Sequence, residues 1–124
     1  MAHEFCWMEL TTDNLKDARG FYSDLFGWSY DDHEMDQGGT YAMFQPGAGG
    51  PGGGMMAKPQ PEVPTAWTPY VAVSDLDASV ERVRELGGTI MMGPAPVPGY
   101  GAFAIVADPT GGVLGLWRSD EASS

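Results

Sequence analysis

The sequence repeats itself at an interval of about 62 residues, and this repeat constrains the fold more than any other feature. Asp13 and Asp75 lie 62 residues apart, and each precedes a segment whose apolar residues have helical spacing. Tyr41 and Phe103 are also 62 residues apart, and each lies in a run typical of a β-strand. The sequence therefore predicts two copies of one module of about 60 residues.

Both halves are predicted to have the same element order, β-α-β-β-β. In the first half Asp13 is the expected N-cap, Gly27 ends the helix, and the acidic stretch 31–36 is expected to be a solvated loop. In the second half Asp75 is the expected N-cap and Gly87 ends a helix about two residues shorter. The predicted strands are 5–12, 40–45 and one that begins at 55 in the first half, then 67–73, 89–92, 101–107 and 112–117 in the second.

These elements predict a single α+β domain over residues 1–124. Module one is expected at about 1–57, a Pro-rich linker at 58–64, module two at 65–118 and a polar tail at 119–124. At 124 residues a chain can bury a hydrophobic core without disulfides. Its one cysteine, Cys6, excludes an internal disulfide framework and a Cys-rich zinc module.

The charge of the chain excludes two classes of partner. Seventeen acidic residues stand against six basic ones, a formal net charge of −11. Such a surface repels phosphate, so no nucleic acid and no anionic membrane are expected as partners. No apolar run is long enough to span a bilayer, and no signal-peptide pattern opens the sequence, so a cytoplasmic location is expected.

Several short motifs, in this order, resemble the vicinal oxygen chelate superfamily of glyoxalases, bleomycin-resistance proteins and dioxygenases. They are residues 7–13 (WMELTTD), 21–28 (FYSDLFGW), 70–77 (YVAVSDLD), 85–88 (ELGG), 98–101 (PGYG) and 108–111 (DPTG). The resemblance implies paired βαβββ modules whose eight strands form one cupped mixed sheet with helices on its outer face. It also implies a small organic ligand in the cup and a homodimer.

The same resemblance implies where a metal would be bound in the metal-dependent members. Their ligands come from the first and fourth strands of each module, which correspond here to Trp7, Thr68, Gly115 and either Met55 or Met56. Indole, thioether and glycine are poor donors for a divalent metal, which prefers imidazole and carboxylate. The two histidines, His3 and His33, lie elsewhere. The sequence thus predicts no metal and no cofactor, and leaves open whether a reaction is catalysed.

Strand alternation predicts which side chains face the cup. Met8, Leu10, Val71 and Val73 are expected to face the helices, while the parity of the third strands, with Tyr41 and Phe103, is ambiguous. The predicted ligand-binding residues are Trp7, Glu9, Thr11, Met56, Thr68, Tyr70, Gly115 and Trp117. An aromatic cup of this kind suits a flat or apolar molecule, and the alternative is that these side chains simply fill it or bury a dimer interface.

Glu9 has three possible roles in this sequence. Its carboxylate can be structural, hydrogen-bonded to Tyr70 or to a backbone amide; it can contact a ligand; or burial can raise its pKa toward that of a general base. Glu9 is accordingly a weak catalytic candidate. The glycine-rich segment 47–54 is expected to form a flexible hairpin or lid over the cup.

We expect a metal-independent protein of the glyoxalase/bleomycin-resistance type that binds a small organic molecule. Two alternatives remain at this point. One is a metal-dependent lyase, isomerase or dioxygenase of the same superfamily, and the other is a non-catalytic interaction module with a filled cup.

Overall fold

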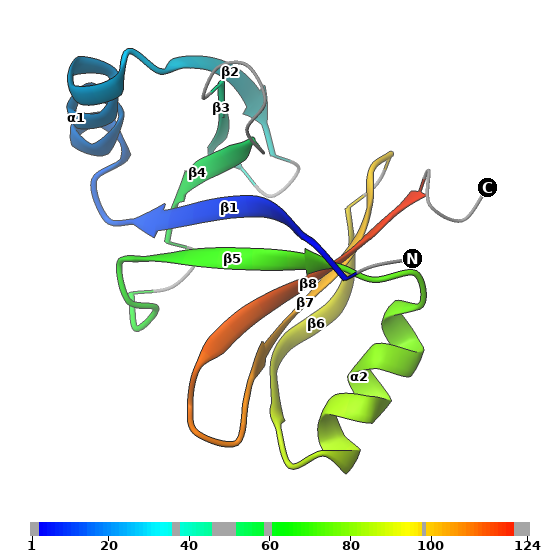
Figure 1. Ribbon diagram of the computed structural model, residues 1–124. Helices are drawn as coiled ribbons and strands as arrows, with labels where there is room; N and C mark the ends of the chain where they lie inside the picture. Colours follow the sequence, from blue (N-terminus) through cyan, green and yellow to red (C-terminus); the bar gives the residue numbers. More distant parts are fainter. Residues whose placement is uncertain (1–2, 36–37, 46–51, 59–60, 98, 121–124) are drawn as a thin grey trace. The chain divides into compact units, whose positions relative to one another are not determined.

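A computed structural model describes residues 3–35, 38–45, 52–58, 61–97 and 99–120 (Figure 1). The chain forms two compact units, one of Trp7–Trp67 and the other of Met1–Cys6 with Thr68–Ser124. The first residues join the second unit because the amide of Ala72 donates a 2.8 Å hydrogen bond to the carbonyl of Glu4. The units are described one at a time below.

The unit Trp7–Trp67 contains helix α1 and four strands in the order β2-β3-β4-β1. Strand β1 is parallel to β4, and the pairs β2·β3 and β3·β4 are antiparallel. Cross-strand partners in these ladders include Glu9 with Gly54 and Met43 with Gly54. The elements are β1 (Phe5–Thr12), α1 (Leu15–Phe26), β2 (Ser29–Glu34), β3 (Thr40–Gln45) and β4 (Gly53–Ala57).

Helix α1 begins one residue later than the sequence predicts. Asn14, not Asp13, is the N-cap, and its side chain accepts a 3.0 Å hydrogen bond from the amide of Asp17. Gly27 ends the helix with a φ of 76°, a left-handed conformation that glycine adopts without strain. One side of the helix packs on a core of buried Leu10, Phe44 and Met55; the side chains around it are Met8, Leu15, Ala18, Tyr22, Trp28, Tyr30 and Trp67.

Two further predictions for this unit are wrong. The acidic residues from Asp31 to Glu34 belong to strand β2 rather than to a loop, because β2 pairs with β3 along its whole length while its acidic side chains stay exposed. Strand β4 begins at Gly53 rather than at Met55, since Gly53 and Gly54 already pair with β1. Of the predicted lid, residues 47–51 lie outside the described residues.

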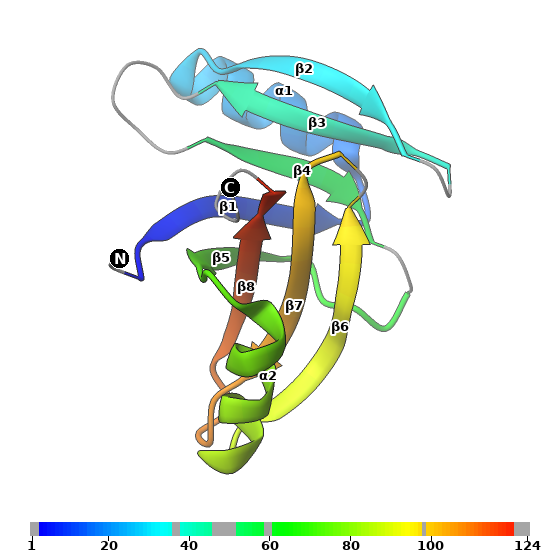
Figure 2. The same cartoon turned by 90° about the vertical axis from the view of Figure 1, so that its right-hand side faces the viewer.

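The second unit has the same arrangement: strands β5 (Ala66–Ala72), β6 (Thr89–Val97), β7 (Gly101–Ala107) and β8 (Val113–Ser119), with helix α2 (Leu76–Glu85). The order β5-β8-β7-β6 matches that of the first unit, with β5 parallel to β8 and the other pairs antiparallel. Figure 2 shows α2 against the sheet of β6, β7 and β8. Strand β6 extends to Val97, five residues beyond its predicted end.

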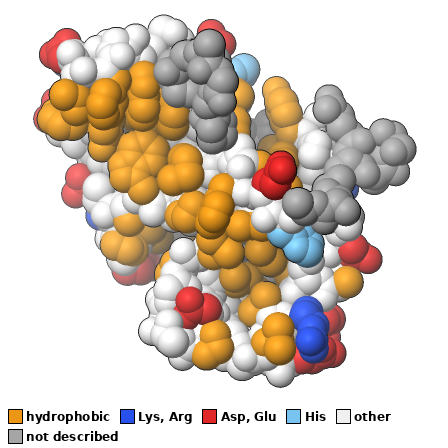
Figure 3. Space-filling model, viewed as in Figure 1, with side chains coloured by type: hydrophobic (Ala, Val, Ile, Leu, Met, Phe, Trp, Pro, Cys, Tyr) orange, Lys and Arg blue, Asp and Glu red, His pale blue; other side chains and the backbone are white. Residues whose placement is uncertain are grey.

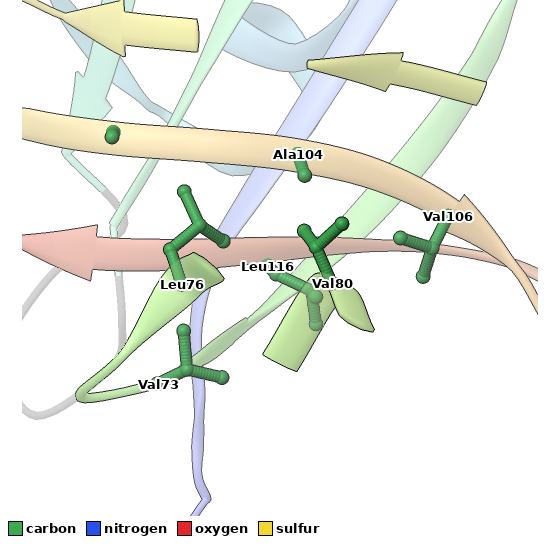
Figure 4. Packing of buried hydrophobic residues seen from close by; sticks show 7 residues of the cluster. Val73, Leu76, Val80, Ala104, Val106 and Leu116 are labelled. Carbon is green, nitrogen blue, oxygen red and sulfur yellow. The ribbon is translucent and has the colours of Figure 1, made fainter. Parts of the chain in front are cut away.

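The core of this unit lies between α2 and its sheet (Figure 4). Asp75 caps α2, as predicted, by accepting a 3.0 Å hydrogen bond from the amide of Ala78. This orients Leu76 and Val80, each 3% exposed, toward the sheet. The buried cluster comprises Val73, Leu76, Val80, Ala102, Ala104, Val106 and Leu116.

The predicted α+β class is confirmed, since the described residues form eight strands of mixed pairing and two helices. The expected difference in helix length is also confirmed, at 12 residues for α1 and 10 for α2. Neither helix is long and apolar enough to cross a membrane, within the described part of the chain. The cup and the module boundaries stay predictions.

Candidate functional site

The first strand presents two different faces, as its alternation predicts. Leu10 is 4% exposed and packs in the core beneath α1, with Met8 at its edge. Trp7, Glu9 and Thr11 alternate with these residues and are only partly buried. Their side chains therefore lie on the sheet face away from α1, where a ligand can be contacted.

A chain of hydrogen bonds joins three residues on this face. The indole Nε1 of Trp7 donates to the hydroxyl of Tyr41 over 2.8 Å. The same hydroxyl donates to Oε2 of Glu9 over 2.9 Å. Hydrogen bonds to a charged acceptor are stronger than neutral ones, so the network holds all three side chains in place. Tyr41 is thus a hydrogen-bond partner of Glu9 within the same module, which the sequence did not indicate.

Gly54 allows Tyr41 to reach Glu9 from a strand that is not adjacent to β1. Strand β4 lies between β1 and β3, with Gly54 paired to Glu9 on one side and to Met43 on the other. A Cβ atom at Gly54 would lie 2.3 Å from carbons of the Tyr41 ring. Because glycine lacks that atom, the ring lies over β4 and spans the gap to Glu9.

Other residues share this surface, which we call the Glu9 face. Met56 is paired with Thr11, His33 with Tyr41, and Asp31 with Met43, and residues paired in this way lie on the same side of a sheet. The Glu9 face therefore consists of Trp7, Glu9, Thr11, Asp31, His33, Tyr41, Met43, Gly54 and Met56. Sequence reasoning missed Asp31 and His33 as part of the face because it placed both in a loop.

The second unit carries the remaining predicted residues on the corresponding strands. Tyr70 is paired with Gly115, and a Cβ atom at Gly115 would lie 2.3 Å from the Tyr70 ring. Trp117 is partly buried and is paired with Ala72 and Phe103, and Thr68 is partly buried on β5. Ligand binding by these four residues stays a prediction.

The residues at the expected metal positions do not fit a divalent metal. Because Gly115 is opposite Tyr70 as Gly54 is opposite Glu9, the register makes Gly54, rather than Met55 or Met56, the counterpart of Gly115. Met55 is fully buried in the core on the other face. Glycine has no side chain that could bind a metal. The indole nitrogen of Trp7 donates a hydrogen bond but has no free lone pair with which to bind a metal. No group of three or more His, Cys, Asp or Glu that could hold a metal occurs among the described residues.

Two other features lie outside the Glu9 face. Burial raises the pKa of the Cys6 thiol, which favours the unreactive protonated form. In the region of α1, hydrophobic side chains gather at the surface (Figure 3). Phe21, Leu25 and Phe26 are each 58% exposed there. Phe21 is therefore an aromatic residue of the same unit that does not belong to the candidate site.

The Glu9 face combines aromatic rings with an oriented carboxylate. Trp7 and Tyr41 offer ring surface for a flat molecule, and Glu9 can accept hydrogen bonds at more than one lone pair. The hydrogen bonds of Trp7 and Tyr41 orient both rings.

Comparisons with known proteins agree on the family. A family model described as the Glyoxalase/Bleomycin resistance protein/Dioxygenase superfamily matches residues 5–115. CFP32 of Mycobacterium tuberculosis, provisionally named a glyoxylase, is 37% identical over 117 residues, which cover 92% of this chain and 45% of the relative. DnrV of Streptomyces peucetius, named an anthracycline biosynthesis protein, is 30% identical over 130 residues, covering 90% and 46%. The chain thus spans about half the length of these relatives.

Solved structures share the fold at low sequence identity. The hypothetical protein BH1468 from Bacillus halodurans superposes with a TM-score of 0.74 at 13% identity, covering 97% of this chain and 96% of that one. The methylmalonyl-CoA epimerase of Mycobacterium tuberculosis has a TM-score of 0.68 at 18% identity, covering 93% and 87%. At these identities the likeness concerns the fold alone.

Proposed function

This chain belongs to the glyoxalase/bleomycin resistance/dioxygenase superfamily, and we propose that within it the chain is a metal-independent binding protein for a small, flat organic molecule. The observation that carries the proposal is the hydrogen-bonded series of Trp7, Tyr41 and Glu9. It supplies two oriented aromatic rings and a carboxylate, and Trp7 occupies one of the positions at which metal-dependent members carry a ligand.

The network favours binding because it reduces the ordering that a ligand must induce. A free Trp or Tyr side chain loses about 0.5–1.5 kcal/mol of conformational freedom when a ligand immobilises it. Here the hydrogen bonds of Trp7 and Tyr41 restrict both side chains beforehand. The rings remain partly exposed, so they can still contact a ligand.

The relatives are consistent with a flat ligand. DnrV is named for anthracycline biosynthesis, and anthracyclines are fused-ring, planar molecules. We propose that the ligand of this chain is likewise flat. The homodimer and the cytoplasmic location expected from the sequence are part of the same proposal. Within the first unit, Thr11 and Met56 belong to the proposed ligand-contact set. Ligand contacts by Thr68, Tyr70, Gly115 and Trp117 are proposed for the second unit by itself.

Equilibrium dialysis with 2-naphthalenemethanol, a neutral flat probe, tests the proposal. We expect binding that persists after dialysis against a metal chelator and that Trp7→Ala weakens at least about tenfold, equivalent to about 1.4 kcal/mol. Phe21→Ala is the matched control, because it removes an exposed aromatic ring from α1 outside the site. Loss of binding on chelation would refute metal independence, and equal effects of the two variants would refute the site.

A further inference from the structure

The two faces of the first unit's sheet differ in their basic side chains, since Lys16 and Arg19 belong to α1, on the side that also carries carboxylates such as Asp32. On the Glu9 face, Asp31 and Glu9 belong to one row of paired residues that crosses the sheet through Met43 and Gly54. Both carboxylates therefore lie on the face that carries the aromatic rings. Asp31 is exposed and Glu9 is partly buried.

The basic residues of this unit lie elsewhere. Arg19 belongs to α1, on the opposite face, where it forms an ion pair with Asp32 at 2.8 Å and its guanidinium lies 4.8 Å from the centre of the Tyr30 ring. Lys16 is also on α1, and Lys58 follows β4 and lies 3.8 Å from Asp13. Among its described residues, the Glu9 face thus carries two carboxylates and no Lys or Arg.

From this asymmetry we infer that the ligand of the Glu9 face is a flat aromatic molecule that carries a protonated amine. The inference rests on the proposed function and adds the charge of the ligand. An ammonium group can donate hydrogen bonds to Glu9, whose position is held by Tyr41. It is also attracted to the faces of tryptophan and tyrosine rings. An anionic ligand would meet the carboxylates of Glu9 and Asp31, and no Lys or Arg among the described residues of this face offsets them.

Three probes of the same ring system and different charge separate this inference from the proposed function. They are 2-(aminomethyl)naphthalene, a cation at neutral pH, 2-naphthalenemethanol, which is neutral, and 2-naphthoate, an anion. Dissociation constants are measured by calorimetry at about pH 8. We expect the cation to bind about tenfold tighter than the neutral probe, and the anion to bind weakest.

Charge-matched variants identify the source of the preference. Glu9→Gln should remove most of the preference for the cation over the neutral probe. Asp24→Asn removes the same charge from an exposed position on α1, and should keep the preference. Asp31→Asn should reduce it partly, and it provides a second variant on the Glu9 face if Glu9→Gln does not fold.

The outcomes distinguish the two proposals. If all three probes bind equally through Trp7, the flat-ligand function stands and the charge inference is overturned. If Asp24→Asn weakens the preference as much as Glu9→Gln, the preference comes from the net charge of −11, and the inference is also overturned. If none of the probes binds, both proposals fail.

Discussion

The substitution Gly54→Ala tests the network most directly, because it adds one carbon where the Tyr41 ring lies. The new Cβ would be 2.3 Å from two ring carbons and 2.4 Å from the hydroxyl oxygen of Tyr41, whereas real Cβ contacts are essentially never closer than 3.0 Å. The ring must therefore move, and its hydrogen bonds to Trp7 and Glu9 must lengthen or break.

The cost follows from these two effects. Overpacking of this kind costs about 1–3 kcal/mol, and each lost hydrogen bond costs about 1 kcal/mol. Alanine in a strand recovers part of this, roughly 0.5–1 kcal/mol relative to glycine. We expect the free energy of unfolding to fall by about 2–4 kcal/mol, which corresponds to roughly 3–5 °C in Tm per kcal/mol for a chain of this size.

A double-mutant cycle with Tyr41→Ala makes the test specific. Urea denaturation followed by circular dichroism measures Gly54→Ala in both backgrounds, and we expect its cost to disappear once the ring is absent. Gly53→Ala is the matched control, since a Cβ at Gly53 would lie 2.1 Å from the carbonyl oxygen of Met8. That clash, together with one against the Phe44 ring, does not involve Tyr41 and should cost the same in both backgrounds. A coupling below about 0.5 kcal/mol between Gly54→Ala and Tyr41→Ala would refute the reasoning.

Two further predictions concern loop and helix ends. The hydroxyl and amide of Thr110, with other backbone amides of the turn, hold the pKa of Asp108 below its usual value. Because the folded pKa is the lower one, Asp108 stabilises the fold above the ordinary carboxyl pKa, and this stabilisation is lost as the pH falls through the folded value. Asp108→Ala should thus lower the free energy of unfolding at neutral pH, with a difference that shrinks as the pH falls below the ordinary carboxyl pKa, and a pH-independent difference would contradict this origin. At α1, Asn14→Ala should cost about 1 kcal/mol. Asp13→Ala removes an exposed carboxylate that lies 3.8 Å from Lys58, and it should cost less than about 0.5 kcal/mol in the same urea assay. The reverse order would restore Asp13 as the cap.

The sequence predicts elements well where local pattern decides them. The strands Phe5–Thr12, Thr40–Gln45 and Gly101–Ala107 have their predicted bounds, because alternating apolar residues end at turn residues in each case. The hairpin turn after Ala107 is also confirmed, with Asp108 accepting hydrogen bonds from within the turn. Periodicity and turn chemistry are both properties of a few neighbouring residues.

The wrong predictions concern places where the structure depends on pairing with a distant strand or on a choice between two neighbouring residues. Asp13 and Asn14 are both residue types that favour the N-cap position, and only the backbone geometry selects Asn14. The backbone amide of Asn14 donates a hydrogen bond to the side chain of the buried Thr12. Strand β2 has an acidic sequence with low strand propensity, and its backbone is held by pairing with β3. Such pairing cannot be read from the residues 29–34 alone.

The candidate site was predictable in part for the same reason. Alternation along β1 placed Trp7 and Glu9 on one face, as observed. The role of Tyr41 depended on the register of three strands, and a shift of one residue would place it on the other face. Gly54 carries no side-chain signal at all, although its missing Cβ is what allows Tyr41 to reach Glu9.

The two modules use the same glycine position in different ways. Gly54 and Gly115 occupy equivalent places in their ladders, and in both a tyrosine ring takes the volume that a Cβ would fill. At Gly54 the ring is that of Tyr41, from β3, and its hydroxyl bonds Glu9. At Gly115 the ring is that of Tyr70, from the directly paired strand β5. The backbone pairing is therefore the same in both modules. Only in module one is the residue paired with this glycine a carboxylate, Glu9. The proposed preference for a cationic ligand is assigned to module one for this reason.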